Sequence, residues 1–218
     1  MWLSRGIRSS GVQSGDSHTQ AGVEVRRARQ ADVPATAAML ARAFLDDPVA
    51  SWAWRAERPR LRALEQFNAL RMRQLLVHEE VWVDADRRCA ALWAPPGHWR
   101  TTLLEDAAHL RTFAHPRLAA RAPLVVYGWL SLARHHPASP PHYYLGVLGT
   151  DPPSQGRGLG SRVLEPVLEE CDRDGVGAFL ESSKESNIAF YSRHGFRVVE
   201  EVHLPAGPPM WAMWRDPR

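Results

Sequence analysis

The sequence has very little cysteine and no long apolar run. Its 218 residues include two cysteines, Cys89 and Cys171, which are too few for a disulfide framework or a cysteine-rich metal site. No apolar segment approaches the roughly 18 residues that a membrane-spanning helix needs. Residues 1–22 are rich in Ser, Gly and Gln and lack the apolar core of a signal peptide, so we expect a disordered leader there. These absences favour a cytoplasmic protein without a membrane segment.

Runs of basic residues are also lacking. The formal net charge is +3, and Lys184 is the single lysine among 27 cationic residues. The arginines are scattered along the chain and do not form an arm of the kind that binds nucleic acid. The ten histidines show no metal-ligand spacing such as H-E-x-x-H, and His135-His136 is interpreted as a solvated loop pair. We therefore expect no nucleic-acid partner and no metal.

The order of apolar patterns along residues 23–218 indicates one mixed α/β domain. Strands are inferred from alternation or short apolar runs, and helices from apolar residues spaced three and four apart. The expected elements are, in chain order, a strand at 23–28, a helix capped by Asp32 that ends before Asp46, a helix at 60–78, strands at 81–83 and 89–94, broken helices at 101–135, a strand at 143–150, a helix from Leu159 to Gly175, a strand at 178–180, a short helix ending at Gly195, and strands at 196–203 and 210–214. No repeat or linker interrupts this order, which is typical of a single α/β domain.

A glycine-rich run, Gln155 to Ser161, is the most informative segment. It lies between an expected strand and an expected helix, and its three glycines allow a positive φ and the close approach of a ligand to the backbone. The first amides of a helix lack internal partners, and the helix dipole adds to their attraction for an anion. Arg157 adds a positive charge. The run therefore predicts a pyrophosphate cradle, and its alternative interpretation is a simple turn.

The kind of phosphate ligand is narrowed by what the run does not contain. A P-loop is excluded because the chain has no Gly-Lys pair. The dinucleotide pattern G-x-G-x-x-G fails in both registers, because its third glycine falls on Ser161 or on Val163. Glu181 does lie about 20 residues downstream, where a dinucleotide fold places its ribose-binding acid, so that interpretation stays open.

Two motifs resemble those of a known family. Gln155, Gly158 and Gly160 match Q-x-x-G-x-G, and the stretch from Asn187 to Phe196 matches N-x-x-F-Y-x-x-x-G-F. Both are similar to conserved stretches of the GNAT superfamily of acetyl-CoA-dependent N-acetyltransferases. The resemblance implies the family's α/β fold, which is a mixed central sheet flanked by helices with two strands splayed apart at the acetyl-CoA site.

The resemblance covers roughly residues 23–217 and is weakest between 95 and 140. Four segments are most similar to family members that acetylate an aminonucleoside antibiotic, namely 81–97, 143–161, 175–198 and 204–215. It implies a transfer of acetyl from acetyl-CoA to a primary amine of a small molecule. The alternatives are a protein or peptide amine as acceptor, a non-catalytic acyl-CoA sensor and, more distantly, a dinucleotide oxidoreductase. A homodimer is left open.

The resemblance also implies roles for individual residues. Leu148, Gly149 and Thr150 would pair through their backbone with the pantetheine arm, and Asn187 would meet that arm from the second helix. The residues implied to hold the pyrophosphate are Gln155, Gly156, Arg157, Gly158, Leu159, Gly160 and Ser161. Tyr191 matches the tyrosine that faces the thioester sulfur and would protonate the leaving thiolate as a general acid. A core tyrosine is the alternative interpretation.

The base and the acceptor pocket are less defined. The attacking amine must be neutral, and Glu181 is a candidate base with a surface or capping carboxylate as its alternative, whereas His142 is a weaker candidate. Asp46 and Asp47 would attract a cationic amine or, equally, form a helix-ending turn. The tryptophans expected on the acceptor side, which would line a pocket for an apolar or aromatic amine, are Trp52, Trp54, Trp93 and Trp99.

Overall fold

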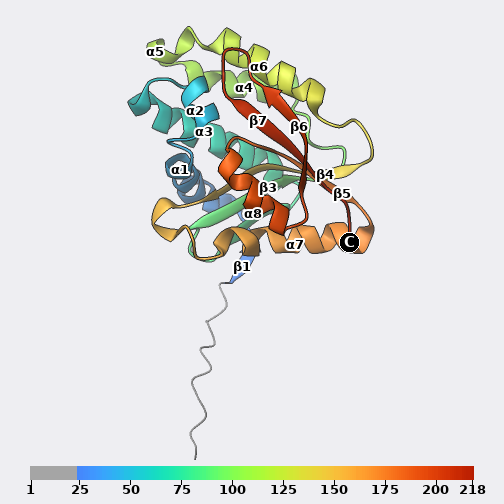
Figure 1. Cartoon of the computed structure of the whole chain (residues 1–218). Coiled ribbons are helices and arrows are strands. Elements are labelled where there is room, and N and C mark those ends of the chain that lie inside the picture. The colour runs from blue at the N-terminus through green and yellow to red at the C-terminus, as the bar shows by residue number, and fades with distance from the viewer. Residues whose placement is uncertain (1–23) are drawn as a thin grey trace, which may run out of the picture.

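Residues 24–218 are described by the computed structural model, so the leader expected at 1–22 and Val23 lie outside the described residues. The helices are α1 (Val33–Ala43), α2 (Pro48–Ala53), α3 (Glu57–Leu76), α4 (Leu103–Leu110), α5 (Pro116–Ala119), α6 (Ala122–His135), α7 (Leu159–Asp174) and α8 (Ile188–Arg193). The strands are β1 (Val25–Arg27), β2 (Val81–Asp84), β3 (Cys89–Ala94), β4 (His142–Thr150), β5 (Gly177–Ser182), β6 (Arg197–His203) and β7 (Pro209–Arg215). Figure 1 shows these elements along the chain.

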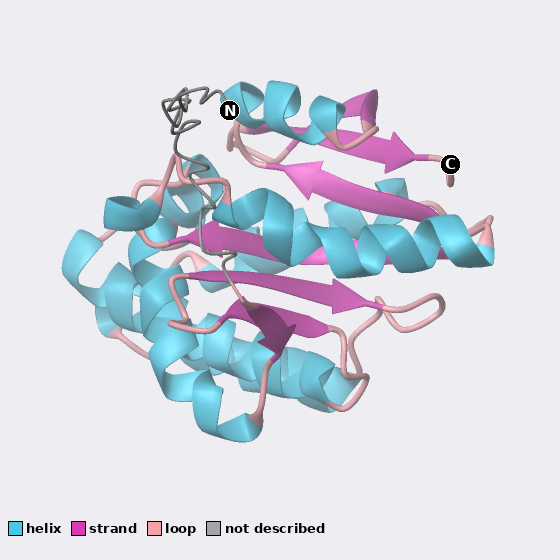
Figure 2. Ribbon diagram, turned by 90° about the horizontal axis from the view of Figure 1, so that it is seen from below, coloured by secondary structure: helices cyan, strands magenta, loops and turns pink. Residues whose placement is uncertain are grey.

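The strands form one seven-stranded sheet in the order β1-β2-β3-β4-β5-β7-β6. The pair β4–β5 is parallel, and the other neighbouring pairs are antiparallel. Helices cover both faces of the sheet (Figure 2). The expected mixed sheet flanked by helices is therefore confirmed.

Strand β3 shows why both faces are covered. Every residue of its sequence CAALWA is buried. Cys89, Ala91 and Trp93 belong to a core cluster that includes α7, whereas Ala90 and Leu92 belong to a second cluster with α1 and α3. Successive side chains point to opposite faces of a strand, so an uninterrupted apolar run requires a layer of helices on each side.

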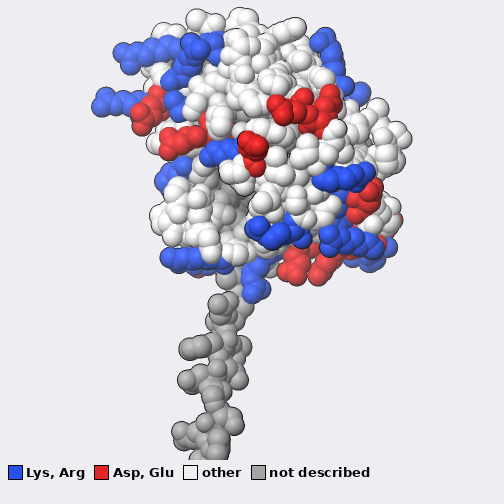
Figure 3. All heavy atoms as spheres, viewed as in Figure 1, with Lys and Arg blue, Asp and Glu red and all other residues white. Residues whose placement is uncertain are grey.

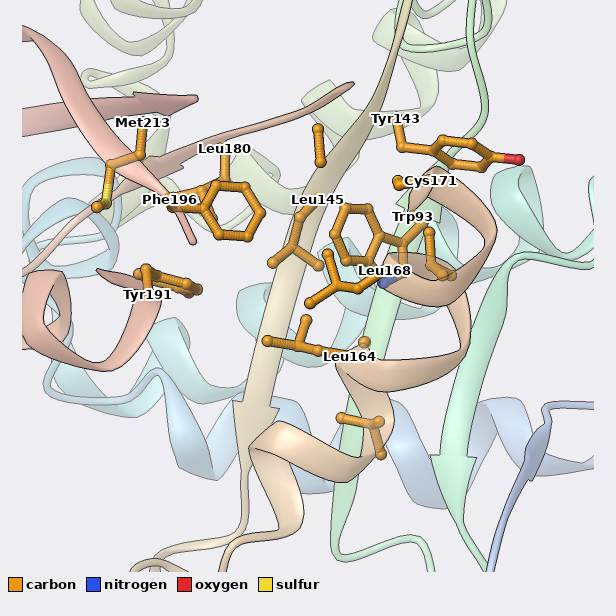
Figure 4. Close-up of a cluster of buried hydrophobic side chains, with 14 of the residues drawn as sticks. Trp93, Tyr143, Leu145, Leu164, Leu168, Cys171, Leu180, Tyr191, Phe196 and Met213 are labelled. Carbon is orange, nitrogen blue, oxygen red and sulfur yellow. The ribbon is translucent and has the colours of Figure 1, made fainter. Parts of the chain in front are cut away.

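Helix α7 packs on the first of these faces. Its buried residues recur at helical spacing and are Leu159, Val163, Leu164, Val167, Leu168 and Cys171. Figure 4 shows Leu164 and Leu168 reaching toward Trp93 and Leu145 of the sheet. The helix ends at Gly175, whose φ of 67° is left-handed, as the sequence predicts for a glycine at this position.

Strands β4 and β5 pair only over their first residues. The last partners are Leu145 and Leu180, and beyond them β4 continues to Thr150 with β3 as its only partner strand among residues 24–218. The splayed pair that the family resemblance implied is therefore present. Among residues 24–218, no strand pairs with this edge of β4 from Gly146 onward.

A β-bulge at Gly146 marks the start of the splay. Leu92 lies opposite Val147 and Trp93 opposite Leu145, so Gly146 is left without a partner on β3. The extra residue also switches the faces, because Leu145 packs in the α7 cluster and Val147, two residues later, packs in the α1–α3 cluster. The bulge thus turns β4 away from β5 at one defined residue.

One helix was missed and one local expectation needs correction. Helix α2 was not predicted from the sequence, because six residues are too few to show a helical period. Asp32 occupies the N-cap position of α1, but its side chain makes no capping bond there. It accepts two bonds from Arg26, at 2.8 and 2.9 Å, and one from the backbone N–H of Arg29 at 2.8 Å.

Candidate active site

The main cavity, of about 710 Å³, opens where β4 and β5 separate and is closed by the glycine-rich loop and α8. The predicted site residues that line it are Leu148, Gly149, Thr150, Gln155, Gly156, Gly158, Leu159, Gly160, Ser161, Glu181, Asn187 and Tyr191. Arg157 is the exception, because its side chain is exposed and does not line the cavity. The structure therefore brings together segments that lie up to about 40 residues apart in the chain.

The glycine-rich loop has the backbone that an anion cradle needs. Gly156 and Gly158 have φ angles of 74° and 75°, in the left-handed region that favours glycine. A Cβ placed on either would meet nothing within 4 Å, so both glycines face open space. Helix α7 begins directly after Gly158, and its first hydrogen bond runs from the N–H of Arg162 to the carbonyl of Gly158 at 3.3 Å. The amides before Arg162 therefore lie at a helix N-terminus without intrahelical partners.

Gln155 holds this loop against β4. Its side-chain amide donates to the carbonyl oxygen of Thr150 at 3.2 Å. The bond closes the turn between the end of the strand and the start of the helix. The structure thus gives Gln155 a contact that positions the loop, in addition to its place on the cavity wall.

Tyr191 lies on α8 with its ring between the core and the main cavity. The residue is 8% exposed, and its ring packs edge-on against Phe190 and Phe196, with centroids 5.2 and 6.0 Å away. Burial raises the pKa of the Tyr191 phenol above its ordinary value, and the Asp47 carboxylate adds to the shift. The phenol therefore keeps its proton at neutral pH. Figure 4 shows the ring at one end of the core cluster.

A second cavity, of about 160 Å³, adjoins the first. Its aromatic lining residues are Phe44, Trp54, Phe67 and Trp129, and Asp47 and Glu181 bring carboxylates to its lining. The residues that line both cavities are Phe44, Asp47, Gly146, Val147, Glu181 and Ser183. The two cavities thus meet at the bulge of β4 and at Glu181.

The residues between α3 and α8 carry the signature of a known family. Residues 71–196 match the model of the acetyltransferase (GNAT) family, which is more than half of the chain. The chain belongs to this family. The glycine-rich loop and the motif that ends at Phe196 both lie inside the matched range.

Similar proteins agree with the family assignment. An N-acetyltransferase of Schizosaccharomyces pombe is 31% identical over 78 residues, which cover 34% of this chain and 32% of that protein. N-alpha-acetyltransferase RimI of Mycobacterium tuberculosis is 28% identical over 116 residues, which cover 50% of this chain and 73% of RimI. The chain thus spans about a third of the length of the S. pombe relative.

A solved structure matches almost the whole fold. A Corynebacterium glutamicum protein, described as histone acetyltransferase HPA2 and related acetyltransferase, has a TM-score of 0.65 and 25% sequence identity. The match covers 89% of this chain and 96% of that one. The GNAT arrangement of sheet and helices therefore extends well beyond the residues that the family model matches.

Glu181, at the end of β5, lies in a polar cluster within this GNAT fold. Its side chain is 5% exposed, and its Oε1 is 3.8 Å from Nδ1 of His136. Tyr144 and Arg71 lie near the same carboxylate. Desolvation raises the pKa of Tyr144 well above its ordinary value, and the charge of Glu181 adds to the rise. Burial lowers the pKa of Arg71, whereas the surrounding acids, Glu181 among them, oppose that shift.

Asp47 has a structural contact for each of its oxygens. One oxygen accepts from the N–H groups of Val49 and Ala50, at 2.9 and 3.1 Å, and caps α2. The other accepts from the Ser183 hydroxyl at 2.5 Å, which ties α2 to the end of β5. Asp47 also lines both cavities. It therefore stabilises the turn at the start of α2 and also places a carboxylate where a cationic amine could meet it. Asp46 is exposed and lines neither cavity.

Only one of the four expected tryptophans lines the second cavity, and it is Trp54. Trp93 is fully buried in the core, and the indole of Trp52 donates to the carbonyl of Pro205 at 3.2 Å. Trp99 stacks on His136 with 3.7 Å between centroids. Phe67 and Trp129 were missed. They lie on the inner faces of α3 and α6, and helical periodicity does not distinguish a cavity wall from a core position.

The interpretation of His135-His136 as a solvated pair is half wrong. His135 is exposed and contacts Glu200 at 3.0 Å, but the side chain of His136 is only 2% exposed. His142, the weaker candidate base, is also buried and lines neither cavity. The C-terminal end of α6 places His136 against the sheet, where the sequence shows no periodic signal.

Within residues 24–218, no group of three or more His, Cys, Asp or Glu residues is arranged to hold a metal ion. No helix in that part of the chain is both long and apolar enough to cross a bilayer. Figure 3 shows cationic and anionic side chains interspersed on the viewed face.

Proposed function

We propose that this GNAT protein transfers an acetyl group from acetyl-CoA to a primary amine of a small molecule. The observation that carries the proposal is the meeting of two cavities at Glu181. The larger one has a glycine cradle and an open strand edge, and the smaller one has aromatic walls with carboxylates. A donor and an acceptor would therefore meet beside a carboxylate.

The residues of the main cavity fit coenzyme A. The open glycine faces and free amides at the start of α7 suit the pyrophosphate, and the unpaired edge of β4 beyond Leu145 suits an arm that adds as a strand. Asn187 and Tyr191 lie on the same wall. When bound, acetyl-CoA supplies an acetyl group activated as a thioester. The residues proposed to hold it are Leu148, Gly149, Thr150, Gln155, Gly156, Gly158, Leu159, Gly160, Ser161 and Asn187.

The second cavity fits an amine with an apolar or aromatic body. Trp54, Phe67 and Trp129 offer flat apolar surfaces, and a cationic amine would be drawn toward Asp47 and Glu181. A volume of about 160 Å³ favours a small group over a protein surface. The amine nitrogen would lie near Gly146, where the two cavities join.

Glu181 then acts as the general base and Tyr191 as the general acid. Glu181 takes a proton from the bound ammonium group, which leaves a neutral amine with a free electron pair. The amine nitrogen forms a bond to the acetyl carbon while the carbon–sulfur bond breaks. Tyr191 gives its proton to the departing thiolate, and the nitrogen's second proton restores the phenol, so the products are an amide and a thiol.

The sequence favours one class of amine acceptor, the aminonucleosides. The segments 81–97, 143–161, 175–198 and 204–215 are similar to stretches of puromycin N-acetyltransferase. An aminonucleoside, which joins a primary amine to aromatic rings, would suit the aromatic walls of the second cavity. On this basis we extend the proposal to an antibiotic-modifying activity.

A panel of acceptors tests the proposal. Thiol release and mass spectrometry would be measured with acetyl-CoA and puromycin, tyramine, agmatine or a peptide with a free N-terminus. We expect an aromatic small amine to gain one acetyl group fastest. Preference for the peptide would support the second candidate, a peptide N-acetyltransferase, which the match to RimI over half of the chain favours. Coenzyme A binding with no thiol release from any amine would indicate a sensor.

A further inference from the structure

A buried pair of histidines lies behind Glu181 and outside both cavities. His136 follows α6 and His142 begins β4, and their Nε2 atoms are 3.0 Å apart. Nδ1 of His142 contacts the carbonyl oxygen of Pro140 at 2.8 Å. Nδ1 of His136 points to Glu181, whose Oε1 is 3.8 Å away. The chain of groups therefore runs from the cavity junction into the protein.

The contacts determine where the ring protons lie. A carbonyl oxygen only accepts, so Nδ1 of His142 carries a proton. Burial lowers the pKa of His142, which keeps this ring neutral, and its Nε2 is therefore an acceptor. Nε2 of His136 must then be the donor. In neutral His136 the remaining nitrogen, Nδ1, has a lone pair, and that lone pair faces the Glu181 carboxylate.

Two acceptors that face each other leave room for one proton between them. The separation of 3.8 Å is longer than a hydrogen bond, as expected when neither atom carries a hydrogen. A proton placed on Nδ1 would convert the contact into a charge-assisted bond and leave the other ring bond unchanged. The geometry therefore leaves space for one proton between Glu181 and Nδ1 of His136.

The surroundings of His136 suit an imidazolium ion. Trp99 stacks on the ring with 3.7 Å between centroids, a geometry in which an indole face stabilises a cation. Three titratable groups lie next to the ring, namely Glu181 on β5 and His142 and Tyr144 on β4. Two arginines lie farther out. Arg71 on α3 faces Glu181 and Tyr144, and Arg100 lies 5.0 Å from the Trp99 ring. Of these, Glu181 is the one carboxylate in contact with His136 within residues 24–218.

We propose that His136 is a positioning residue that acts through Glu181 and takes onto Nδ1 the proton that Glu181 removes from the acceptor amine. This inference rests on the proposed function. The ammonium group R–NH3+ gives a proton to the carboxylate, and the carboxyl group passes it to Nδ1. The products are a neutral amine, a restored carboxylate and an imidazolium ion held by Trp99 and His142.

The first test needs neither acetyl-CoA nor an amine substrate. Histidine ring 15N NMR on the free protein would report the protonation of each nitrogen. We expect neutral His142 to carry its proton on Nδ1 and neutral His136 to carry its proton on Nε2. At about pH 6.5, Glu181→Gln should lower the ratio of protonated to neutral His136 by about tenfold, since an opposite charge is removed. An unchanged ratio, or a neutral His136 protonated on Nδ1, would overturn the inference.

The second test is kinetic. The pH dependence of kcat would be measured with the fastest amine of the panel. In His136→Gln we expect the acidic limb to move to lower pH and kcat to fall by about tenfold, with an unchanged KM for acetyl-CoA. His135→Gln, which changes the exposed neighbour, is the matched control and should behave as the unmodified protein does. A His136→Gln variant with an unmoved limb would show that the ring only packs.

The two tests separate the inference from the function on which it rests. If no amine reacts, the proposed function fails even where NMR shows the coupled proton. If amines react but the limb stays in place, the function stands and the relay fails. Should His136→Gln not fold, Trp99→Leu removes the stacked face alone and is expected to lower imidazolium stability, which moves the limb in the same direction.

Discussion

Leu145 and Leu180 are the last partners across β4 and β5, and the main cavity begins where their pairing ends. Gly146 follows at once as a bulge, so the strand turns away from its neighbour within one residue. The donor cavity and the acceptor cavity share this bulge. The site is therefore formed at an irregularity of the sheet, and the residues around this bulge are the ones whose substitution should affect binding and catalysis.

Coenzyme A should stabilise the folded protein. A ligand that binds only the native state raises the free energy of unfolding by about 2.7 kcal/mol at a hundred times its Kd. Thermal unfolding with coenzyme A, NAD or ATP checks this, and coenzyme A should raise the Tm most. A larger rise with NAD would favour the dinucleotide interpretation.

Gly158→Ala should weaken acetyl-CoA binding. The residue has a φ of 75°, and a Cβ there would project into the open space of the cradle. Gly175→Ala is the matched control, because Gly175 ends the same helix with a φ of 67° and also has nothing within 4 Å of its Cβ. Both variants should lose about 1 kcal/mol of stability from backbone strain. Only Gly158→Ala should raise the KM for acetyl-CoA, and equal values for the two would show that the loop is merely a turn.

Tyr191→Phe should reduce kcat by about 10² to 10⁴, the usual range for general acid catalysis. The ring stays in place between Phe190 and Phe196, so stability should change little. Tyr143→Phe alters a buried tyrosine that lies outside the main cavity and should leave kcat unchanged. Near-normal turnover of Tyr191→Phe would make it a packing residue. An acyl donor with a better leaving thiol should reduce the loss.

The glycine-rich loop and α7 could be predicted from sequence, because glycine spacing and helical period are local signals. The splay of the two strands came only through family resemblance, and its position at Gly146 was not predicted, since the bulge depends on the register between β3 and β4. The burial of His136 gave no signal, because the packing of a residue at a helix end is decided by the sheet beneath it. Trp129 was missed because core and cavity positions share one periodicity.

Acid should destabilise the fold in part through Asp32. The hydrogen bonds from Arg26 hold the pKa of this carboxyl well below its usual range, and the bond from the backbone N–H of Arg29 adds to the shift. A depressed folded pKa contributes stability above the unfolded pKa of about 3.9, and this stability is lost as the pH falls below that value. Arg26→Met should cost about 1 kcal/mol at pH 7, as measured by urea unfolding, and much less in an Asp32→Asn background, which lacks the partner charge. An equal loss in both backgrounds would exclude the ion pair as its cause.

Trp129→Leu should weaken acceptor binding and leave the donor site intact. Trp129 lies on α6, is half-buried and walls only the second cavity. The smaller side chain gives up apolar contact with the acceptor, and a loss of about 1.4 kcal/mol is a tenfold rise in KM for an aromatic amine. The KM for acetyl-CoA should not change. Trp82→Leu on β2 is the control, because Trp82 is also half-buried but lines neither cavity. If both variants raised the acceptor KM equally, the effect would come from general destabilisation, and the acceptor would have to lie elsewhere.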